Sequence, residues 1–263
     1  MAPFTLAIVA AINALTATSF GAVAARLSRR STGGGHALAV GALAAWWGCM
    51  STLLGLQALE AALATIGVVS LGFSTGIRML NGPLLATGSW GLCFHVLYLW
   101  TGRERIALYI APFFALVGFS YIASVVLHPI VDLIPSSYEL TAVYDPPLEG
   151  ALWTFVLAAV GLPLIVATTF YLVLVRKLDQ RDQRRRAMLA SAGILLWVGS
   201  GLVIQLSGEP IADFVTYTAF GMLAAILVFL GYFPPGRLRA KDAPGNYVEL
   251  RRGVHQHALR KNG

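Results

Sequence analysis

The sequence predicts an all-α integral membrane protein: a bundle of seven transmembrane helices with its N-terminus outside and its C-terminus in the cytoplasm. Composition is the first observation behind this prediction, because 57% of the 263 residues are hydrophobic and only 12% are charged. A typical soluble domain carries about 25% charged residues. The second observation is a succession of apolar segments long enough to cross a bilayer. The third is positive charge on alternate connections, as expected when Lys and Arg are retained in the cytoplasm.

Seven segments are predicted to span the membrane, because a hydrocarbon core of ~30 Å requires about 20 apolar residues in a helix. They cover residues 3–26, 38–59, 83–101, 106–128, 150–175, 187–206 and 210–233. Together they define a transmembrane domain, residues 1–233. The sequence Pro234-Pro235-Gly236 ends the last helix, and a basic cytoplasmic tail follows over residues 234–263.

The apolar segment 61–80 has a different interpretation. It contains Arg78 and is followed by Asn81-Gly82-Pro83. Because proline is favoured in the first turn of a helix, the third span is predicted to begin at Pro83. An eighth span over residues 61–78 would place the Arg cluster of residues 26–30 outside, against the charge rule. Segment 61–80 is therefore expected to be an extra apolar piece on the outer side.

Positive charge gathers on the predicted inner connections. Of the 19 Lys and Arg residues, all but Arg78 lie in residues 26–30, 103–105 and 176–186 or after residue 233. In a soluble protein, the net charge of +7 would indicate nucleic acid as a partner. Here the positive charge lies where it would contact anionic lipids of the cytoplasmic leaflet. Lipid is therefore the expected partner, and nucleic acid is not. The predicted location is the inner or plasma membrane, crossed several times.

Two connections are long or charged enough to carry function. The outer connection 129–149 contains four prolines, and it is either a lid over an outward pocket or a solvated connector. The inner connection 176–186 could couple the bundle to a protein partner, but contact with lipid headgroups explains its charge equally well. Its candidate coupling residues are Arg176, Arg181, Arg184, Arg185 and Arg186.

The sequence indicates no cofactor, no metal site and no catalytic residues. It lacks a phosphate-binding P-loop, an HExxH motif and a CxxC pair. The last predicted helix, 210–233, has no lysine for a retinal Schiff base. His95 and His128 are predicted to differ in depth by roughly 20 Å or more, too far for a haem held by two histidines. An enzyme is therefore not expected.

His95 lies within the predicted span 83–101, where an ionisable group is costly. It could form a hydrogen bond to a neighbouring helix, or it could contact a proton or ligand. Trp90, Phe94 and Tyr98 follow helical spacing on one face of the same span. This stripe is more typical of core packing than of a ligand cage.

Polar and aromatic residues are concentrated in the outer half of the predicted bundle. An arginine at membrane depth costs about 2.5–3.5 kcal/mol on insertion scales unless it is paired or hydrated. Asp213 and Glu209 are the expected partners of Arg78, and the group predicts a ligand pocket. In the alternative interpretation, Asp213 only stabilises the first turn of its helix and Arg78 reaches outer water. The candidate ligand-binding residues are Arg78, Asn81, Tyr121, Trp153, Gln205, Glu209, Asp213 and Tyr217.

Three stretches carry a resemblance to a known family. They are Leu56-Gln57-Ala58-Leu59-Glu60, Leu97-Tyr98-Leu99-Trp100-Thr101-Gly102-Arg103, and residues 150–171 leading into the Arg-rich inner connection. Over most of residues 38–233, the chain resembles the seven-helix N-terminal sensor region of prokaryotic histidine kinases. The resemblance implies a module that signals from outside to inside, and it assigns no individual site residues. Segment 61–80 is longer than the matching connection of that family, and no kinase domain follows the last helix, so a stand-alone module is expected to act through a partner.

The leading functional hypothesis is a sensory or regulatory membrane protein that binds a small or lipophilic ligand in the outer half of the bundle. A structural or assembly subunit of a larger membrane complex is the first alternative. A membrane enzyme or transporter is the second. The sequence shows no inverted repeat with paired broken helices, which a transporter of that kind would carry.

Overall fold

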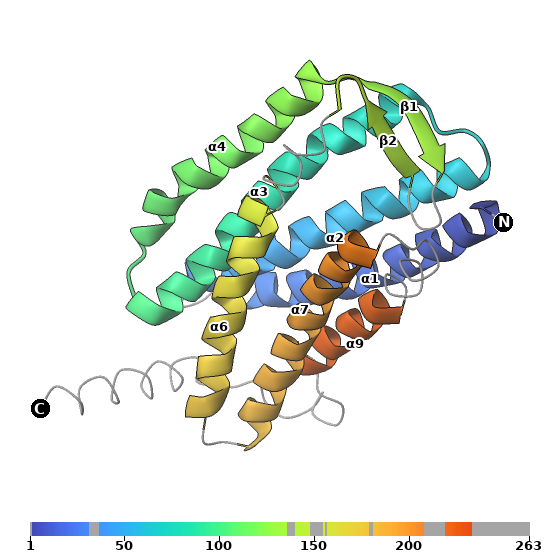
Figure 1. Cartoon of the computed structure of the whole chain (residues 1–263). Helices are drawn as coiled ribbons and strands as arrows, with labels where there is room; N and C mark the ends of the chain where they lie inside the picture. Colours follow the sequence, from blue (N-terminus) through green and yellow to red (C-terminus); the bar gives the residue numbers. More distant parts are fainter. Residues whose placement is uncertain are drawn as a thin grey trace, which may run out of the picture. The chain divides into compact units, whose positions relative to one another are not determined.

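The computed structural model describes residues 2–31, 37–135, 140–147, 155, 157–178, 181–207 and 219–232. These residues are mostly helical (Figure 1). The α-helices are α1 (Ala2–Arg30), α2 (Ala37–Thr65), α3 (Leu71–Thr101), α4 (Ile106–Leu127), α6 (Leu162–Lys177), α7 (Arg181–Ser207) and α9 (Gly221–Tyr232), and a π-helical turn, η1 (Leu157–Gly161), precedes α6. All of them belong to one unit, residues 1–232, and the predicted tail lies outside the described residues.

Three of the helices are long and apolar enough to cross a membrane. They cover Phe4–Arg29, Ala37–Thr65 and Ile106–Leu127, and the apolar helices Leu162–Arg176 and Gly221–Tyr232 are shorter. Only 22% of the span Ile106–Leu127 is buried inside the protein, so most of its apolar surface faces outward, as lipid contact requires. These helices support a membrane protein, while the seven crossings and their orientation stay predictions.

Helices α1 to α4 pack as successive antiparallel neighbours, which their short connections favour. Ser51 of α2 donates a hydrogen bond to the carbonyl of Ala17 in α1 at 2.7 Å. The start of α2 lies beside the end of α3, where the distance from His95 Nδ1 to the carbonyl oxygen of Ala39 is 3.0 Å. The end of α2 and the start of α3 therefore lie together at the opposite end of the bundle.

Helices α6, α7 and α9 form a second group that closes onto the first. The C-terminal Gly231 of α9 lies against Ala190 near the start of α7, and Gly221 lies against Trp197, so α7 and α9 are antiparallel. Contacts of α9 with α1 and of α6 with α3 join the two groups. The order α1, α2, α3, α6, α7, α9 thus closes on itself, and α4 packs on α3.

Aromatic side chains fill the space where α1, α2, α6, α7 and α9 meet. The ring centroid of Phe20 lies 5.0 Å from that of Trp47 and 6.0 Å from that of Trp197. An enclosed cavity of about 10 Å³ remains among them, roughly the smallest space that holds one water molecule. The centre of the described bundle is a packed core and not a channel.

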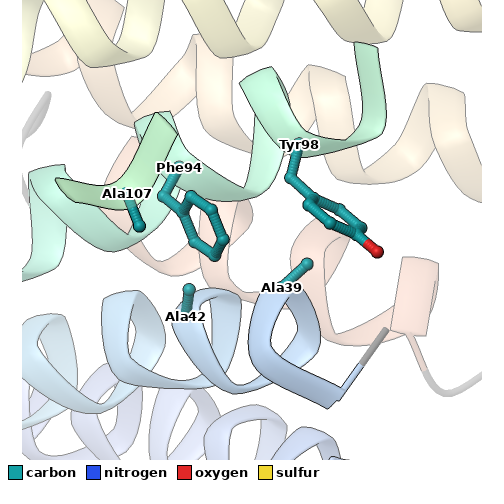
Figure 2. Packing of buried hydrophobic residues seen from close by; sticks show 5 residues of the cluster. All are labelled: Ala39, Ala42, Phe94, Tyr98 and Ala107. Atoms are coloured by element: carbon teal, nitrogen blue, oxygen red, sulfur yellow. The ribbon is translucent and has the colours of Figure 1, made fainter. Parts of the chain in front are cut away.

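A second cluster of buried residues joins the start of α2 to the end of α3. Phe94 and Tyr98 point from α3 toward Ala39 and Ala42 of α2, with Ala107 of α4 beside them (Figure 2). Trp90 stacks on Phe94 with ring centroids 5.9 Å apart and packs against this cluster. The prediction that this aromatic stripe serves core packing is confirmed.

Small residues allow α2 to approach its neighbours closely. A Cβ atom at Gly91 of α3 would lie 2.4 Å from the carbonyl oxygen of Ala42, so only glycine fits there without a shift of backbone. On the other side of α2, Gly48 faces Ala24 of α1. Helices without a hydrophobic driving force between them associate through such close packing.

The prediction that the third span begins at Pro83 is wrong. Helix α3 begins twelve residues earlier, at Leu71, and contains Pro83 in its interior. Ser70 caps it by accepting a hydrogen bond from the amide of Phe73 at 3.2 Å. Segment 61–80 is therefore the last turns of α2, a short turn, and the first turns of α3, which tolerate a later proline as membrane helices do.

The connection after α4, predicted as a lid or a solvated connector, contains strands that the all-α prediction did not include. Strands β1 (Ile130–Pro135) and β2 (Leu140–Tyr144) form a two-stranded antiparallel sheet. The hairpin lies on α2 and α3, with β1 against α3 and β2 against α2 (Figure 1). An isolated two-stranded hairpin is marginal in water, and here two helices support it.

Candidate functional site

Arg78 lies where α2, α3 and the hairpin meet. Its Nη2 atom is 3.3 Å from Oε2 of Glu60 in α2. The same nitrogen donates a hydrogen bond to the carbonyl oxygen of Leu140 in β2 at 2.7 Å. One guanidinium group therefore ties together three elements that are far apart in the sequence.

The local fold explains this position. Helix α2 ends at Thr65, and a short turn with Gly67 in the left-handed conformation (φ 70°) reverses the chain into α3. Glu60 is five residues before that end, and Arg78 is seven residues after the start of α3, so antiparallel packing brings them face to face. Leu140 begins β2 and pairs with Pro135.

Both charges are largely shielded from the surroundings. The side chain of Glu60 is 4% exposed and that of Arg78 is 14% exposed. Desolvation costs each charge several kcal/mol, and mutual attraction and hydrogen bonds offset this cost only while both partners are present. Loss of either side chain is therefore expected to lower the stability of the protein strongly.

Three buried oxygen atoms near Arg78 have no hydrogen-bond partner among the described residues. They are Oε1 of Glu60, Oγ of Ser74 and Oδ1 of Asn81. Ser74, Arg78 and Asn81 are spaced i, i+4, i+7 and so share one face of α3. Buried polar atoms nearly always have a partner, so these oxygens are places for bound water or for a ligand's donors.

A groove lies between the α2–α3 turn and the hairpin. Its volume is about 270 Å³. The lining residues are Ala64, Gly67, Val69, Leu71, Asp132, Leu133 and Leu140. Most of them are apolar, and Asp132 is the one charged residue that the described part of the chain contributes to this lining. Leu140 is also the residue that Arg78 holds.

Tyr121 of α4 closes the other side of this region. Its ring lies against Gly82, where a Cβ atom would come within 2.4 Å of the ring, so a side chain at position 82 would displace it. The ring centroid of Phe155 is 4.4 Å away. Tyr121 is also close enough to interact electrostatically with Arg78 and with Tyr144 of the hairpin.

The predicted site residues divide into two groups. Arg78, Asn81 and Tyr121 gather at this end of the bundle, which we name the hairpin end after the α2–α3 turn and residues 130–144. The remaining predicted positions, Trp153, Glu209, Asp213 and Tyr217, lie outside the described residues, as does the side chain of Gln205 in α7.

The described partner of Arg78 is Glu60, whereas the sequence analysis named Asp213 and Glu209. Neither Glu60 nor Ser74 was predicted as part of the site. A signal for both was present, because Gly67 followed by Ser70 is a turn and a helix cap. A helix starting after Ser70 would have placed Arg78 opposite Glu60.

Ser74 also stands in a sequence pattern, because residues 72–76 read Gly-Phe-Ser-Thr-Gly and match Gly-x-Ser-x-Gly. In serine hydrolases, this pattern forms a sharp turn between a strand and a helix that exposes the nucleophile. Here the five residues lie in the first turns of α3, and Ser74 is fully buried. The motif therefore does not form a nucleophile elbow.

The two histidines lie at opposite ends of the bundle. His95 is 3% exposed and bonds to the Ala39 carbonyl, the interhelical link that was one of its two predicted roles. His128 follows α4 at the hairpin end, with Nδ1 2.9 Å from the carbonyl oxygen of Pro146. In the part of the chain that the structure describes, no group of three or more His, Cys, Asp or Glu side chains could hold a metal ion.

The predicted coupling residues flank the α6–α7 connection. Arg176 belongs to the last turn of α6, and Arg181, Arg184, Arg185 and Arg186 belong to the first turns of α7. Since α6 runs in the same direction as α3, they lie at the end of the bundle away from the hairpin, which we name the basic end. All except the half-buried Arg186 are exposed.

No protein-family model matches the chain, and no curated protein matches it either. The resemblance to the sensor region of histidine kinases stays a prediction from the sequence.

Proposed function

We propose that this chain is a sensory or regulatory membrane module that binds a small or lipophilic ligand at the hairpin end. In this proposal, seven helices cross the inner or plasma membrane with the hairpin end outside, and a separate protein receives the signal. The observation that carries the proposal is the double contact of Arg78, to Glu60 of α2 and to the Leu140 carbonyl of the hairpin.

The contact connects the groove to the helices. Leu140 lines the groove and is held by Arg78, so a ligand that shifts β2 also changes the surroundings of the Arg78–Glu60 pair. Removing the Leu140 carbonyl takes away one of the two acceptors of Arg78 Nη2. A ligand shifts such an equilibrium only by its difference in affinity for the two states, and the groove is the place where that difference would arise.

A route from α3 to the basic end is also available. The hydroxyl of Ser89, in the middle of α3, donates a hydrogen bond to the carbonyl of Ala159 in η1. The turn η1 leads directly into α6, whose last turn carries Arg176. Movement of α3 against η1 would therefore reach the connection between α6 and α7. Anionic lipid headgroups or a protein partner bound at that connection would respond to its movement.

The proposal is tested by ligand-dependent thermal stability of the full chain in lipid nanodiscs. A panel of small amphiphiles is screened, and a ligand that binds the folded state raises the Tm with its concentration. Leu133→Trp fills the groove and is expected to abolish this increase. Leu127→Trp is the matched control, because Leu127 is 72% exposed at the end of α4 and does not line the groove. Full stabilisation of the Leu133→Trp variant would contradict the proposal.

A second candidate function, an assembly subunit, has one observation in its favour. Helix α4 exposes large apolar side chains along its length, each at least 67% exposed: Leu108, Tyr109, Leu116, Phe119 and Leu127. Lipid covers such a surface in a monomer, and a partner helix covers it in a complex. Native mass analysis from mild detergent separates the two, since a stoichiometric protein partner favours the assembly subunit.

A further inference from the structure

We infer that the groove at the hairpin end takes a cationic amphiphile, a molecule with an ammonium group on a short apolar body. The inference rests on the proposed function and names the chemical class of its ligand. Its starting point is the groove lining, to which the described residues contribute one carboxylate, that of Asp132, among mostly apolar side chains.

The strand geometry positions Asp132. Ile130 pairs with Tyr144, and Asp132 pairs with the very next residue of β2, Val143, so Val131 is an extra residue in β1. Such bulges re-aim side chains and recur beside functional sites. The Oδ1 atom of Asp132 accepts a hydrogen bond from the amide of Leu133 at 2.8 Å, which holds the carboxylate in place and leaves Oδ2 for a ligand.

The charges around the groove favour a cation over an anion. The one basic side chain described beside it, Arg78, already gives its Nη2 to Glu60 and to the Leu140 carbonyl. An anion in the groove would meet the negative charge of Asp132, and Arg78 already carries the carboxylate of Glu60 as its counter-ion. The Arg78–Glu60 pair carries no net charge, so Asp132 sets the sign of the charge at the groove.

The remaining wall suits a short hydrocarbon chain. Ala64, Val69, Leu71 and Leu133 supply apolar surface. The volume of about 270 Å³ is slightly below the ~300–1,000 Å³ of typical small-molecule sites, so the groove suits a compact ligand. The groove therefore combines an apolar wall with one oriented carboxylate, which matches a compact alkylammonium in both shape and charge.

The test compares three probes that share an eight-carbon chain: octylammonium, octanol and octanoate. Each is titrated calorimetrically against the full chain in nanodiscs of zwitterionic lipid, and the heat with empty nanodiscs is subtracted. We expect octylammonium to bind saturably, more tightly than octanol, with octanoate weakest. Asp132→Asn is expected to weaken octylammonium about fivefold, as for a partly exposed ion pair, and to leave octanol unchanged. Asp145→Asn, which removes the same charge just after β2 and outside the groove lining, is the matched control.

The inference is overturned if octanoate binds as tightly as octylammonium, or if Asp132→Asn and Asp145→Asn have the same effect. If, in that case, octanol or octanoate still binds saturably to the wild type and fails to bind the Leu133→Trp variant, that result supports the proposed function and shows that only the inferred charge of the ligand is wrong. If none of the three probes binds saturably above empty nanodiscs, the inference fails. The proposed function still stands if other amphiphiles raise the Tm of the wild type in the thermal screen and do not raise that of the Leu133→Trp variant.

Discussion

Arg78 and Glu60 stabilise the protein only as a pair. Each side chain is at least 86% buried, so neither charge recovers its hydration when the other is removed. Removing one partner of a buried pair costs about 3–5 kcal/mol, whereas replacing both with apolar residues is often neutral. Because Arg78 also donates a hydrogen bond to the Leu140 carbonyl, the position of the hairpin depends on the same pair.

A double-mutant cycle measures this pairing. We expect Glu60→Leu and Arg78→Met each to lower the free energy of unfolding by about 3 kcal/mol, because each leaves one buried charge without its partner. The double variant is expected to lose much less than the sum. The measurement is denaturant unfolding in detergent, and Asp182→Leu with Arg186→Met, at the more exposed start of α7, provides a control cycle with a coupling of about 1 kcal/mol or less. Additive losses at Glu60 and Arg78 would exclude the coupling.

Helices α2 and α3 are the long elements of the hairpin end, with 29 and 31 residues. Their contact extends from the Arg78–Glu60 pair at one end to His95 and Ala39 at the other. Gly91 sets the distance between them, because its missing side chain leaves room for the backbone of Ala42. Gly91 lies about three and a half helical turns from Arg78 along α3. The helix carries the effect of this close contact to the position of Arg78 relative to α2.

Gly91→Ala is expected to lower the free energy of unfolding by about 1–3 kcal/mol, as overpacking against a backbone atom does. Gly76→Ala in the same helix is the control, since nothing lies within 4 Å of a Cβ atom there. We expect that control to be neutral or to stabilise the helix by up to about 1 kcal/mol. Equal effects of the two substitutions, measured by thermal unfolding, would show that α2 and α3 do not pack closely at Gly91.

The sequence predicted the helical elements better than their ends. Apolar length located α1, α4 and the start of α2 within a few residues, because burial in lipid requires such runs, but α2 extends to Thr65, beyond the predicted end at residue 59. The start of α3 was misplaced, since Pro83 was assigned to the first turn of the helix, whereas Ser70 caps the helix that the structure shows. A proline inside a membrane helix is tolerated when neighbouring groups satisfy the freed backbone, and that depends on tertiary contacts.

The hairpin was not predicted, for a similar reason. Residues 130–135 and 140–144 are short and contain β-branched residues, but the prolines around them indicated an irregular connector. Two short strands become stable when they rest on α2 and α3, which single-sequence patterns do not reveal. For the same reason, Arg78, Asn81 and Tyr121 were placed in one region from depth alone, whereas the pairing of Arg78 with Glu60 required the helix packing.

At the scale of the whole molecule, the hairpin end and the basic end lie at opposite ends of the helices. The basic end contains the end of α1 with Arg26 and Arg29, the turn before α4, and the α6–α7 connection. Because positive connections are retained in the cytoplasm, the proposed orientation places the hairpin end outside. This separation is what a protein that senses on one side and signals on the other requires.

Labelling of single cysteines tests the orientation. In a background with Cys49 and Cys93 replaced by alanine, Asp145→Cys is expected to react with a membrane-impermeant maleimide in intact cells. Arg184→Cys is expected to react only after permeabilisation, because the Arg-rich connection faces the cytoplasm. Both positions are exposed in the protein, so burial does not bias the comparison. The reverse pattern would place the hairpin end inside and contradict the proposed function.

The unequal lengths of the helices make the Arg78–Glu60 pair sensitive to bilayer thickness. At 1.5 Å per residue, α4 measures about 33 Å and fits a ~30 Å hydrocarbon layer, whereas α2 and α3 reach about 43 and 46 Å. Shared between two ends, the surplus is about 7–8 Å at each end, so the pair, about 8–10 Å from the tips of these two helices, lies at the edge of the acyl chains in the proposed orientation. Lipids with longer acyl chains would immerse it, so hydrophobic mismatch would tighten or loosen the hold on the hairpin without any ligand.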